Sequence, residues 1–510
     1  MELTNKVHAP NFFAKFSKGR INWRLGITLF TGKILGLLVV LAAMKLLPGM
    51  IATPASAGET FTAHETMLMN TANTIWTLVA AFLVFGMQAG FVMLEAGFAR
   101  SRETVNVLME CIFDTCLCGL LFWAIGYAFM FSPGSGDGFG FIGKHWFFLQ
   151  GAPDTYLTTG IPVIAHWIFQ YAFADTCSTI VSGAMIGRTS FRGDILYSIG
   201  ITGFIYPIIG NWAWGPDGFL ANMGSTGHFL PTLGNGFRDF AGSTVVHTIG
   251  GVASLAGAIV LGPRLGRIFK RDGGGPMAGH SMTLGAVGTF ILWFGWYGFN
   301  PGSSLSAVDM QGIGRIATNT TLAACAGGMV AMYLGLWFGD TKGKFDVGLT
   351  CNGVLGGLVA ITCPCYWVDP LGAVLLGGIA GIVVYYGIQL LEYLRIDDPI
   401  GAVPVHGFAG IWGTISLGLF APGKYGATGP YGADNSAPVA GLFYGGGTSV
   451  LKAQVIGTFT IAIAVFIVTF VMMYLIKLLP NPWGLRVEKH IEEGGLDLLE
   501  HGSLAYPVQD

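Results

Sequence analysis

Long apolar segments of about twenty residues recur along this chain of 510 residues, and they constrain its fold more than any other feature. Inside a bilayer the backbone finds no water, so a crossing segment satisfies its own N–H and C=O groups by forming a helix. About twenty helical residues span the hydrocarbon core. Charged residues make up 11% of the chain, whereas soluble domains carry about 25%. We therefore expect an all-α polytopic membrane protein that is surrounded by a lipid bilayer.

The hydropathy of the chain predicts eleven transmembrane helices after residue 57. Glycine occurs 79 times, roughly twice its usual frequency, and small residues let membrane helices approach closely. No basic block is long enough to follow a phosphate backbone, so we expect no nucleic-acid partner. The predicted spans cover residues 71–95, 105–131, 161–187, 195–215, 240–263, 281–300, 312–338, 347–368, 370–391, 402–421 and 452–479.

The first 57 residues differ from the rest of the chain. Basic residues precede a short apolar core at 34–44, and Ala55, Ser56 and Ala57 fit the small-x-small cleavage pattern. We interpret 1–57 as a signal peptide cleaved after Ala57, because this core is too short to span a bilayer. An additional uncleaved helix is the alternative. The remaining chain then divides into a membrane domain, 58–480, and a C-terminal tail, 481–510.

Basic residues alternate between successive loops. One set of loops is basic throughout and lies on the same side as the tail, while the other set carries only Lys144, Arg238 and Lys424. The positive-inside rule then places the mature N-terminus outside and the tail in the cytoplasm, in a multi-pass plasma (inner) membrane protein. The basic set comprises Arg100, Arg102, Arg188, Arg192, Arg264, Arg267, Lys270, Arg271, Lys342, Lys344 and Arg395, with Arg486 and Lys489 in the tail.

One residue pattern occurs twice. Residues 239–251 read DFAGSTVVHTIGG and residues 398–410 read DPIGAVPVHGFAG. Each copy has Asp, then Gly three residues later, Val seven, His eight and Gly twelve residues later. The first copy opens the fifth span and the second leads into the tenth, so an odd number of spans separates equivalent points. The sequence therefore predicts two inverted five-helix repeats and a final helix, a plan typical of transporters.

The two histidines of this pattern are candidate functional residues. Eight helical residues rise about 12 Å, close to half of a hydrocarbon core of about 30 Å. We therefore expect His247 and His406 side by side near the midplane, where ionisable groups are costly and usually functional. Two separate core histidines with local hydrogen bonds are the alternative. Asp239 and Asp398 are interpreted mainly as helix N-caps, with cation attraction at the outer mouth as a lesser role for Asp239.

Aromatic residues gather in the predicted outer half of the spans. Phe169 and Phe173 lie four residues apart on the third span, and Trp214 ends the fourth. Phe299 and Ser303 lie at the outer end of the sixth span. Such a set is either an interfacial aromatic belt or a cation–π cup with a hydroxyl acceptor. Rings below the cup would form an apolar gate that removes water from the ion.

These motifs resemble the ammonium transporter (Amt/Mep/Rh) family, on its ammonium transporter branch. The resemblance is carried by DFAGSTVVHTIGG, GFVMLEAGFARS, WYGFNPGSS, DDPIGAVPVHGFAGIWG and the tail GLRVEKHIEEGGLDLLEHGSLAY, and it runs from about residue 70 to 507. It implies a homotrimer with one pore in each subunit and ammonium, ammonia or methylammonium as the substrate. It also implies a PII-type signalling protein as a partner at the cytoplasmic face. We expect no enzyme activity, cofactor or metal.

The resemblance also assigns roles to the candidate residues. The mechanism that it implies is that ammonium is recruited and deprotonated, that ammonia crosses the pore, and that the proton follows a separate relay through the histidines, which would make transport electrogenic. The assigned residues are His247 and His406 as twin pore histidines, Phe173 and Phe299 as the gate, and Trp214, Phe169, Ser303 and Asp239 as the ammonium-binding site.

Two positions, Gly401 and His166, fall outside the family pattern. Some family members carry an acidic residue five positions before the second histidine, where this chain has Gly401. His166 belongs to no motif of the family and is treated as structural.

An ammonium sensor and an Rh-type gas channel are the alternatives within the family. A membrane haem protein with histidine ligands is the alternative among enzymes.

Overall fold

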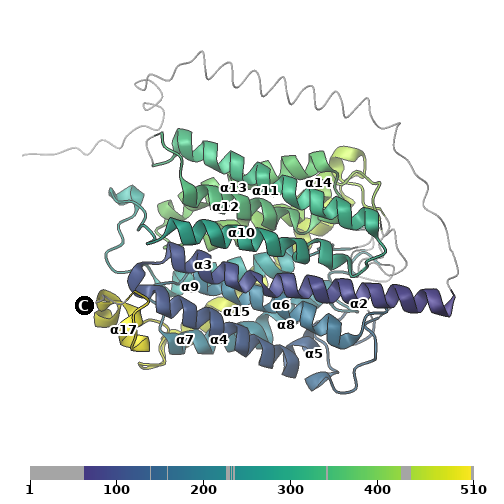
Figure 1. Cartoon of the computed structure of the whole chain (residues 1–510), viewed down its shortest axis with the longest axis horizontal. Coiled ribbons are helices and arrows are strands. Elements are labelled where there is room, and N and C mark those ends of the chain that lie inside the picture. Colours follow the sequence, from purple (N-terminus) through teal and green to yellow (C-terminus); the bar gives the residue numbers. More distant parts are fainter. Residues whose placement is uncertain are drawn as a thin grey trace, which may run out of the picture. The chain divides into compact units, whose positions relative to one another are not determined.

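The computed structural model of the chain describes residues 62–137, 139–157, 159–225, 230, 233, 236–340, 343–426 and 438–506. The predicted signal peptide, 1–57, lies outside the described residues. The described part is helical and contains isolated β-bridges but no strand. In Figure 1 its long helices run roughly side by side, as expected for a membrane bundle.

The α-helices are α2 (Ala63–Phe85), α3 (Met87–Phe98), α4 (Thr104–Leu121), α5 (Tyr127–Phe131), α6 (Val163–Gly183), α7 (Phe191–Gly200), α8 (Tyr206–Trp214), α9 (Ile249–Leu261), α10 (Met282–Phe299), α11 (Met310–Phe338), α12 (Val347–Ile361), α13 (Pro370–Leu394), α14 (Ala409–Phe420), α15 (Ser449–Lys477), α16 (Lys489–Gly494) and α17 (Leu496–His501). Four π-helical segments join some of them: η3 (Phe122–Gly126), η5 (Ile201–Ile205), η7 (Ser243–Thr248) and η11 (Val403–Phe408). Short 3₁₀ turns cover Ser101–Glu103, Phe147–Leu149, Lys270–Asp272, Pro301–Ser304, Pro364–Tyr366 and Leu442–Tyr444.

Nine helical stretches in the described residues are long and apolar enough to cross a membrane. The predicted spans 161–187 and 347–368 are not among the nine. The first corresponds to α6, which has 21 residues but carries His166, Gln170 and Asp175. The second corresponds to α12, which is apolar but has only 15 residues. The prediction of a multi-pass helical membrane protein is confirmed, and the count of eleven spans stays a prediction.

The stretch that carries His247 lies at the centre of the described bundle. Segment η7 and helix α9 together form one span, Ser243–Leu261. In its apolar stretch, 89% of the residues are buried inside the protein. Helix α9 packs against α6 on one side and α15 on another, and it contacts η11. Gly251 of α9 lies directly against the backbone of Gly407 in η11. Small residues at this crossing therefore bring the two histidine-bearing elements together.

The C-terminal tail packs against the ends of the helices. The Nε2 atom of His501 in α17 lies 2.9 Å from the Asn106 side-chain oxygen in α4, and the Asn106 N–H donates to Asp497 at 3.1 Å. Glu492 in α16 is buried against Arg486. Figure 1 shows α17 beside the ends of α4 and α7. The described part of the tail is therefore a packed element rather than a free, solvated end.

Candidate functional site

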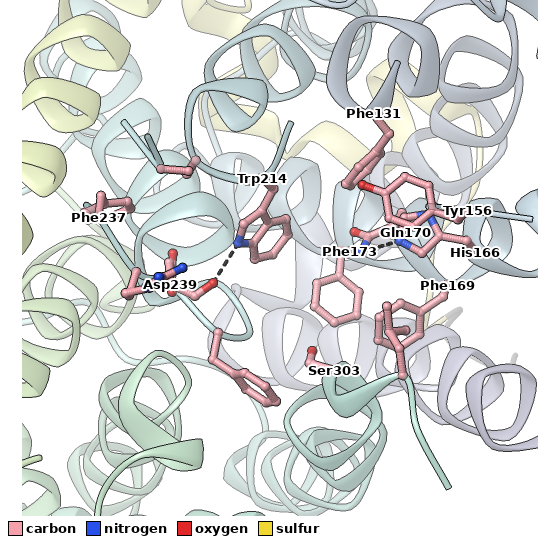
Figure 2. A pocket seen from close by; sticks show the side chains of 15 residues that line it. Phe131, Tyr156, His166, Phe169, Gln170, Phe173, Trp214, Phe237, Asp239 and Ser303 are labelled. Atoms are coloured by element: carbon pink, nitrogen blue, oxygen red, sulfur yellow. Dashed lines mark hydrogen bonds between the residues drawn. The ribbon is translucent and has the colours of Figure 1, made fainter. Parts of the chain in front are cut away.

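A cavity of about 190 Å³ lies among the helices, and most of the candidate residues line it (Figure 2). Its walls come from α6, the end of α8, the loop before η7 and the turn after α10. Five of the eight assigned residues line the cavity directly, and the other three lie along the path that leads from it. The five are Phe169, Phe173, Trp214, Asp239 and Ser303.

Trp214 and Ser303 each donate a hydrogen bond to a backbone carbonyl at the cavity wall. The Trp214 Nε1–H donates to the Asp239 carbonyl oxygen at 2.7 Å, so the indole is anchored by its edge. The Ser303 hydroxyl donates to the Phe299 carbonyl oxygen at 2.7 Å. Because its single proton is used there, the Ser303 oxygen keeps its lone pairs for a donor in the cavity. The wall thus offers an anchored aromatic ring and a hydroxyl acceptor.

A continuous file of rings leads from the cavity to the two histidines. The Phe169 and Phe173 rings lie 4.7 Å apart between centroids, and Phe173 stacks on Phe299 at 4.0 Å. Phe299 in turn stacks on His247 at 5.3 Å, and His247 stacks on His406 at 5.3 Å. All five side chains are buried. The file is therefore apolar near the cavity and polar at its far end.

The two histidines lie in direct contact. Their Nδ1 atoms are 3.2 Å apart, so one ring donates and the other accepts. His247 is fully buried and also stacks on Trp296, whose Nε1–H donates to the Thr362 hydroxyl. The Nε2 atom of His247 has no hydrogen-bond partner in the described residues. The pair thus forms one hydrogen-bonded unit with a free nitrogen on His247.

The two aspartates of the repeated pattern cap the histidine-bearing segments. Asp239 accepts three backbone N–H groups, from Gly242 and the first residues of η7, at 2.8–3.1 Å. Asp398 accepts three in the second copy, from the residues three, four and five positions later, at 2.8–3.0 Å. Burial raises the pKa of each carboxyl to about 6, against the opposing effect of these N–H groups. Both carboxyls therefore have the geometry of N-caps.

A glycine makes each cap possible. Gly242 has φ 109° and Gly401 has φ 81°, in the left-handed region that glycine adopts without strain. This turns the following N–H groups back toward the aspartate. A side chain at position 401 would be strained, and its Cβ would meet the Asn352 side chain at 2.7 Å. The backbone conformation at Gly401 therefore disfavours an acidic side chain at this position.

Sequence reasoning missed part of the cavity wall. His166, which it treated as structural, lines the cavity together with Gln170, Tyr156 and Phe131. The signal lay in the helical spacing, because residues three, four and seven positions after His166 share its face of α6. Phe169, Gln170 and Phe173 occupy these positions. In the part of the chain that the structure describes, no group of His, Cys, Asp or Glu is arranged to hold a metal ion.

A model of the Ammonium Transporter Family matches residues 75–506 of the chain. The chain belongs to this family. It is 42% identical over 458 residues to the ammonium transporter Amt2 of Archaeoglobus fulgidus, a match that covers 89% of this chain and 92% of its relative. It is 41% identical to a putative ammonium transporter of Synechocystis, over 86% of this chain and 90% of that protein.

Solved structures of the same family share the fold. A structure described as a sensor Amt protein superposes with a TM-score of 0.73 at 32% identity, covering 85% of this chain and 99% of that one. The structure of Saccharomyces cerevisiae Mep2 superposes with a TM-score of 0.72 at 27% identity, covering 86% and 92%. The all-helical membrane fold of this family member is thus that of Amt and Mep proteins.

Proposed function

We propose that this family member transports ammonium across the plasma membrane, recruiting it in the cavity and conducting ammonia past the ring file. The names of its relatives support the substrate. The cavity suits a small cation, since Trp214, Phe169 and Phe173 offer π faces and Ser303 offers an acceptor oxygen. Methylammonium has the same charge and N–H donors and is a second substrate.

The ring file is the single observation that carries the mechanism. A bare cation in an apolar passage loses several kcal/mol or more of hydration free energy. Phe173 and Phe299 stack tightly just below the cavity, so the substrate reaches the histidines only without its water shell. Neutral ammonia avoids this cost. We therefore place deprotonation at the floor of the cavity, before the substrate passes the two phenylalanines.

The histidine pair then relays the proton that ammonium releases. Neutral imidazole carries one donor and one acceptor nitrogen, and the 3.2 Å Nδ1–Nδ1 contact joins the two rings into one relay. Two imidazoles so close resist being charged together, which disfavours a cation resting beside them. Proton and ammonia rejoin on the far side, so net transport is electrogenic.

The architecture of the proposal is that of two inverted five-helix repeats and an eleventh helix. Its support is that Asp239 and Asp398 each cap a histidine-bearing segment through backbone N–H groups, and that His247 contacts His406. The basic loops meet the tail on one face, since Arg486 of the tail donates to the Leu261 and Pro263 carbonyl oxygens and Arg102 donates to the Glu493 carbonyl oxygen. We assign that face to the cytoplasm. Assembly as a homotrimer and binding of a PII-type protein at this face belong to the same proposal.

Currents on solid-supported membranes test the transport mechanism. Proteoliposomes that contain the wild-type protein should give a transient current on an ammonium pulse and a smaller one with methylammonium. His247→Ala and His406→Ala should each lose the ammonium-selective current, because either change breaks the relay. Unchanged, ammonium-selective currents in both variants would contradict the relay. Uptake without any current would instead favour conduction of ammonia alone.

A sensor is the second candidate function, because one of the similar solved structures is described as a sensor Amt protein. Growth on low ammonium of a host that lacks its own ammonium transporters separates the two functions. A transporter restores growth and ammonium uptake, and both depend on His247. A sensor that does not transport leaves uptake at the level of the empty host, although it still binds ammonium.

A further inference from the structure

One face of α6 presents four side chains to the cavity. His166, Phe169, Gln170 and Phe173 all line it, at helical positions that share a face. Figure 2 shows His166 and Gln170 across the cavity from Trp214 and Asp239. The two phenylalanines belong to the proposed recruitment site and gate. The two polar residues have no role in the mechanism described above, although both face the same space.

The His166 ring is held in one orientation by three neighbours. Its Nδ1 atom lies 2.9 Å from the Tyr127 hydroxyl. The Tyr156 ring stacks on it with centroids 3.8 Å apart and planes 6° apart, and the Phe131 ring meets it edge-on at 4.9 Å. The ring is 1% exposed. Only Nε2 is left for a further partner, and it points toward Gln170.

This imidazole fixes the Gln170 amide. The Gln170 Nε2 atom lies 3.4 Å from His166 Nε2, so the amide donates and the imidazole nitrogen accepts. The proton of His166 is then on Nδ1, where the Tyr127 hydroxyl oxygen accepts it. With its NH₂ group toward the histidine, the amide keeps its oxygen for the cavity. That oxygen is buried and has no hydrogen-bond partner, and Gln170 as a whole is only 7% exposed.

A buried carbonyl oxygen without a donor is unfavourable, and it marks a place where a donor is expected. The cavity also holds the Ser303 hydroxyl, whose proton is already used. The wall therefore presents two acceptor oxygens, from α6 and from the turn after α10, together with aromatic faces. An ammonium ion has N–H groups in four tetrahedral directions, so it satisfies both oxygens and still meets the rings.

We propose that the Gln170 side-chain oxygen accepts an N–H of ammonium in the cavity and that His166 is the positioning residue that holds this amide. The inference rests on the proposed transport of ammonium and adds a binding residue to it. Gln170 contributes to affinity before the substrate is deprotonated, and it takes no part in the step at the histidine pair. Substitutions there should change the apparent KM and leave the maximal rate alone.

Current amplitudes over a range of ammonium concentrations test this assignment. Gln170→Met, which keeps the side-chain length without the oxygen, should raise the apparent KM roughly tenfold or more, because a hydrogen bond to a charged group is lost. Gln170→Glu keeps an acceptor oxygen and should show an apparent KM at or below that of the wild type. Gln389→Met on α13, whose amide bonds Lys270 and lines no part of the cavity, is the control and should change nothing.

The positioning role of His166 has its own test. His166→Phe keeps a ring between Tyr156 and Phe131 but lets the amide rotate, so the apparent KM should rise several-fold in the wild-type background. In the Gln170→Glu background the same change should have no effect on KM, because either carboxylate oxygen is an acceptor. Equal effects in both backgrounds would show that His166 acts only on the fold.

Three outcomes would overturn the inference. An unchanged KM in Gln170→Met rejects the contact, and a lowered KM indicates that the amide nitrogen faces the cavity instead. If Gln170→Met does not yield folded protein, a raised KM in Gln170→Glu rejects the contact. Wild-type protein that gives neither current nor uptake contradicts the proposed function itself, so the two failures are distinguishable.

Discussion

Trp214 illustrates how a single residue supplies a binding surface. The hydrogen bond from its indole N–H to the Asp239 carbonyl fixes the edge of the ring, and the face of the ring remains at the cavity. Phe173 meets this ring at 6.1 Å in a T-shaped contact, which joins the cavity wall to the gate. A cation above such an aromatic face gains about 0.5–2 kcal/mol, depending on its desolvation.

Replacement of this ring should weaken recruitment and leave the pore intact. We expect Trp214→Leu to raise the apparent KM for ammonium by about 3- to 30-fold, the equivalent of the lost cation–π contact. Trp212→Leu is the matched control, since Trp212 lies two residues earlier on α8 and its N–H bonds Phe141 outside the cavity lining. Concentration dependence of the transport current measures both. Equal KM values for Trp214→Leu and the wild type would reject the cation–π cup.

At the residue scale, helical spacing predicted that the two histidines lie together, whereas the roles of the gate and of the ammonium-binding residues came from the family resemblance. The eight-residue interval from aspartate to histidine placed His247 and His406 at similar depth, and the structure brings them into contact. Helical spacing places His166 on the same face of α6 as Phe169 and Phe173, but its stacking on Tyr156 was not predictable, because no pattern in the sequence links a residue of the loop before α6 to a helix face. Its role in the cavity depends on tertiary packing alone.

Close backbone approach governs packing at the scale of the elements. A Cβ atom on Gly251 would lie 2.7 Å from the carbonyl carbon of His406 and closer still to the backbone of Gly407. Real Cβ atoms do not come so near to backbone. Helix α9 and segment η11 would have to separate, and the histidine contact between them would lengthen with them.

Gly251→Ala should therefore abolish transport through a change of packing. We expect a loss of ammonium-selective current and a lower midpoint of thermal unfolding in detergent, since overpacking typically costs about 1–3 kcal/mol. Gly378→Ala on α13 is the matched control, because its Cβ would meet only the Val330 side chain at an ordinary 3.6 Å. Wild-type current in Gly251→Ala would show that the crossing tolerates a wider spacing than the structure has.

A buried ion-pair cluster joins the ends of several helices. Arg264, after α9, donates to both carboxylate oxygens of Asp397 at 2.8 and 2.9 Å, and all of these groups are buried. Arg188, after α6, donates to the Asp397 carbonyl. Burial opposes the charge of Asp397, but Arg264 and Arg188 hold the pKa of its carboxyl well below the usual range. Charge on Asp397 is therefore favoured in the folded state.

Asp397→Asn should destabilise the protein in a pH-dependent way. Loss of one partner of a buried pair costs about 3–5 kcal/mol, because the arginine charge stays behind. A lowered pKa contributes stability that is fully present above the unfolded value of about 3.9 and is lost progressively as the pH falls from there through the lower pKa of the folded state. The unfolding midpoints of variant and wild type should thus converge below about pH 4.

Asp272→Asn is the control for this cluster, because Asp272 pairs with Arg395 at an exposed position. It should leave the unfolding midpoint unchanged. A constant difference between Asp397→Asn and the wild type from pH 7 to about pH 2 would contradict the assignment of the effect to the carboxylate charge.

The elements themselves were partly predictable. Hydropathy located all nine helical stretches of the described residues that are long and apolar enough to cross a membrane, because about twenty apolar residues are what a bilayer span requires. It did not indicate where a helix widens into a π-helical segment, as η7 and η11 do around the histidines. Those segments begin at a positive-φ glycine and an aspartate cap, and their winding follows from contacts with other elements rather than from apolar periodicity.

Assembly belongs to the scale of the whole molecule. A homotrimer should give a native mass three times that of the denatured chain, measured in the same detergent preparation by native mass spectrometry. Its apolar interfaces are expected to survive mild detergent, since obligate interfaces resemble a divided hydrophobic core. A sample that transports ammonium but contains only single chains would contradict the trimer while leaving the pore mechanism intact.

Cleavage of the predicted signal peptide would set the length and orientation of the mature molecule. We expect N-terminal sequencing of the purified protein to begin at Gly58, directly after Ala55, Ser56 and Ala57, because small residues at these positions fit the cleavage site. Ala57→Leu should block cleavage and yield a protein that is heavier by the mass of residues 1–57. Ser56→Leu changes the residue between the two small positions and should not block cleavage. A mature protein that starts at Met1 would mean an additional helix. The tail would then lie on the opposite side of the membrane, or the first span would cross the membrane in the opposite direction. A fluorescent protein fused to the tail, which becomes fluorescent only in the cytoplasm, then decides between these two arrangements.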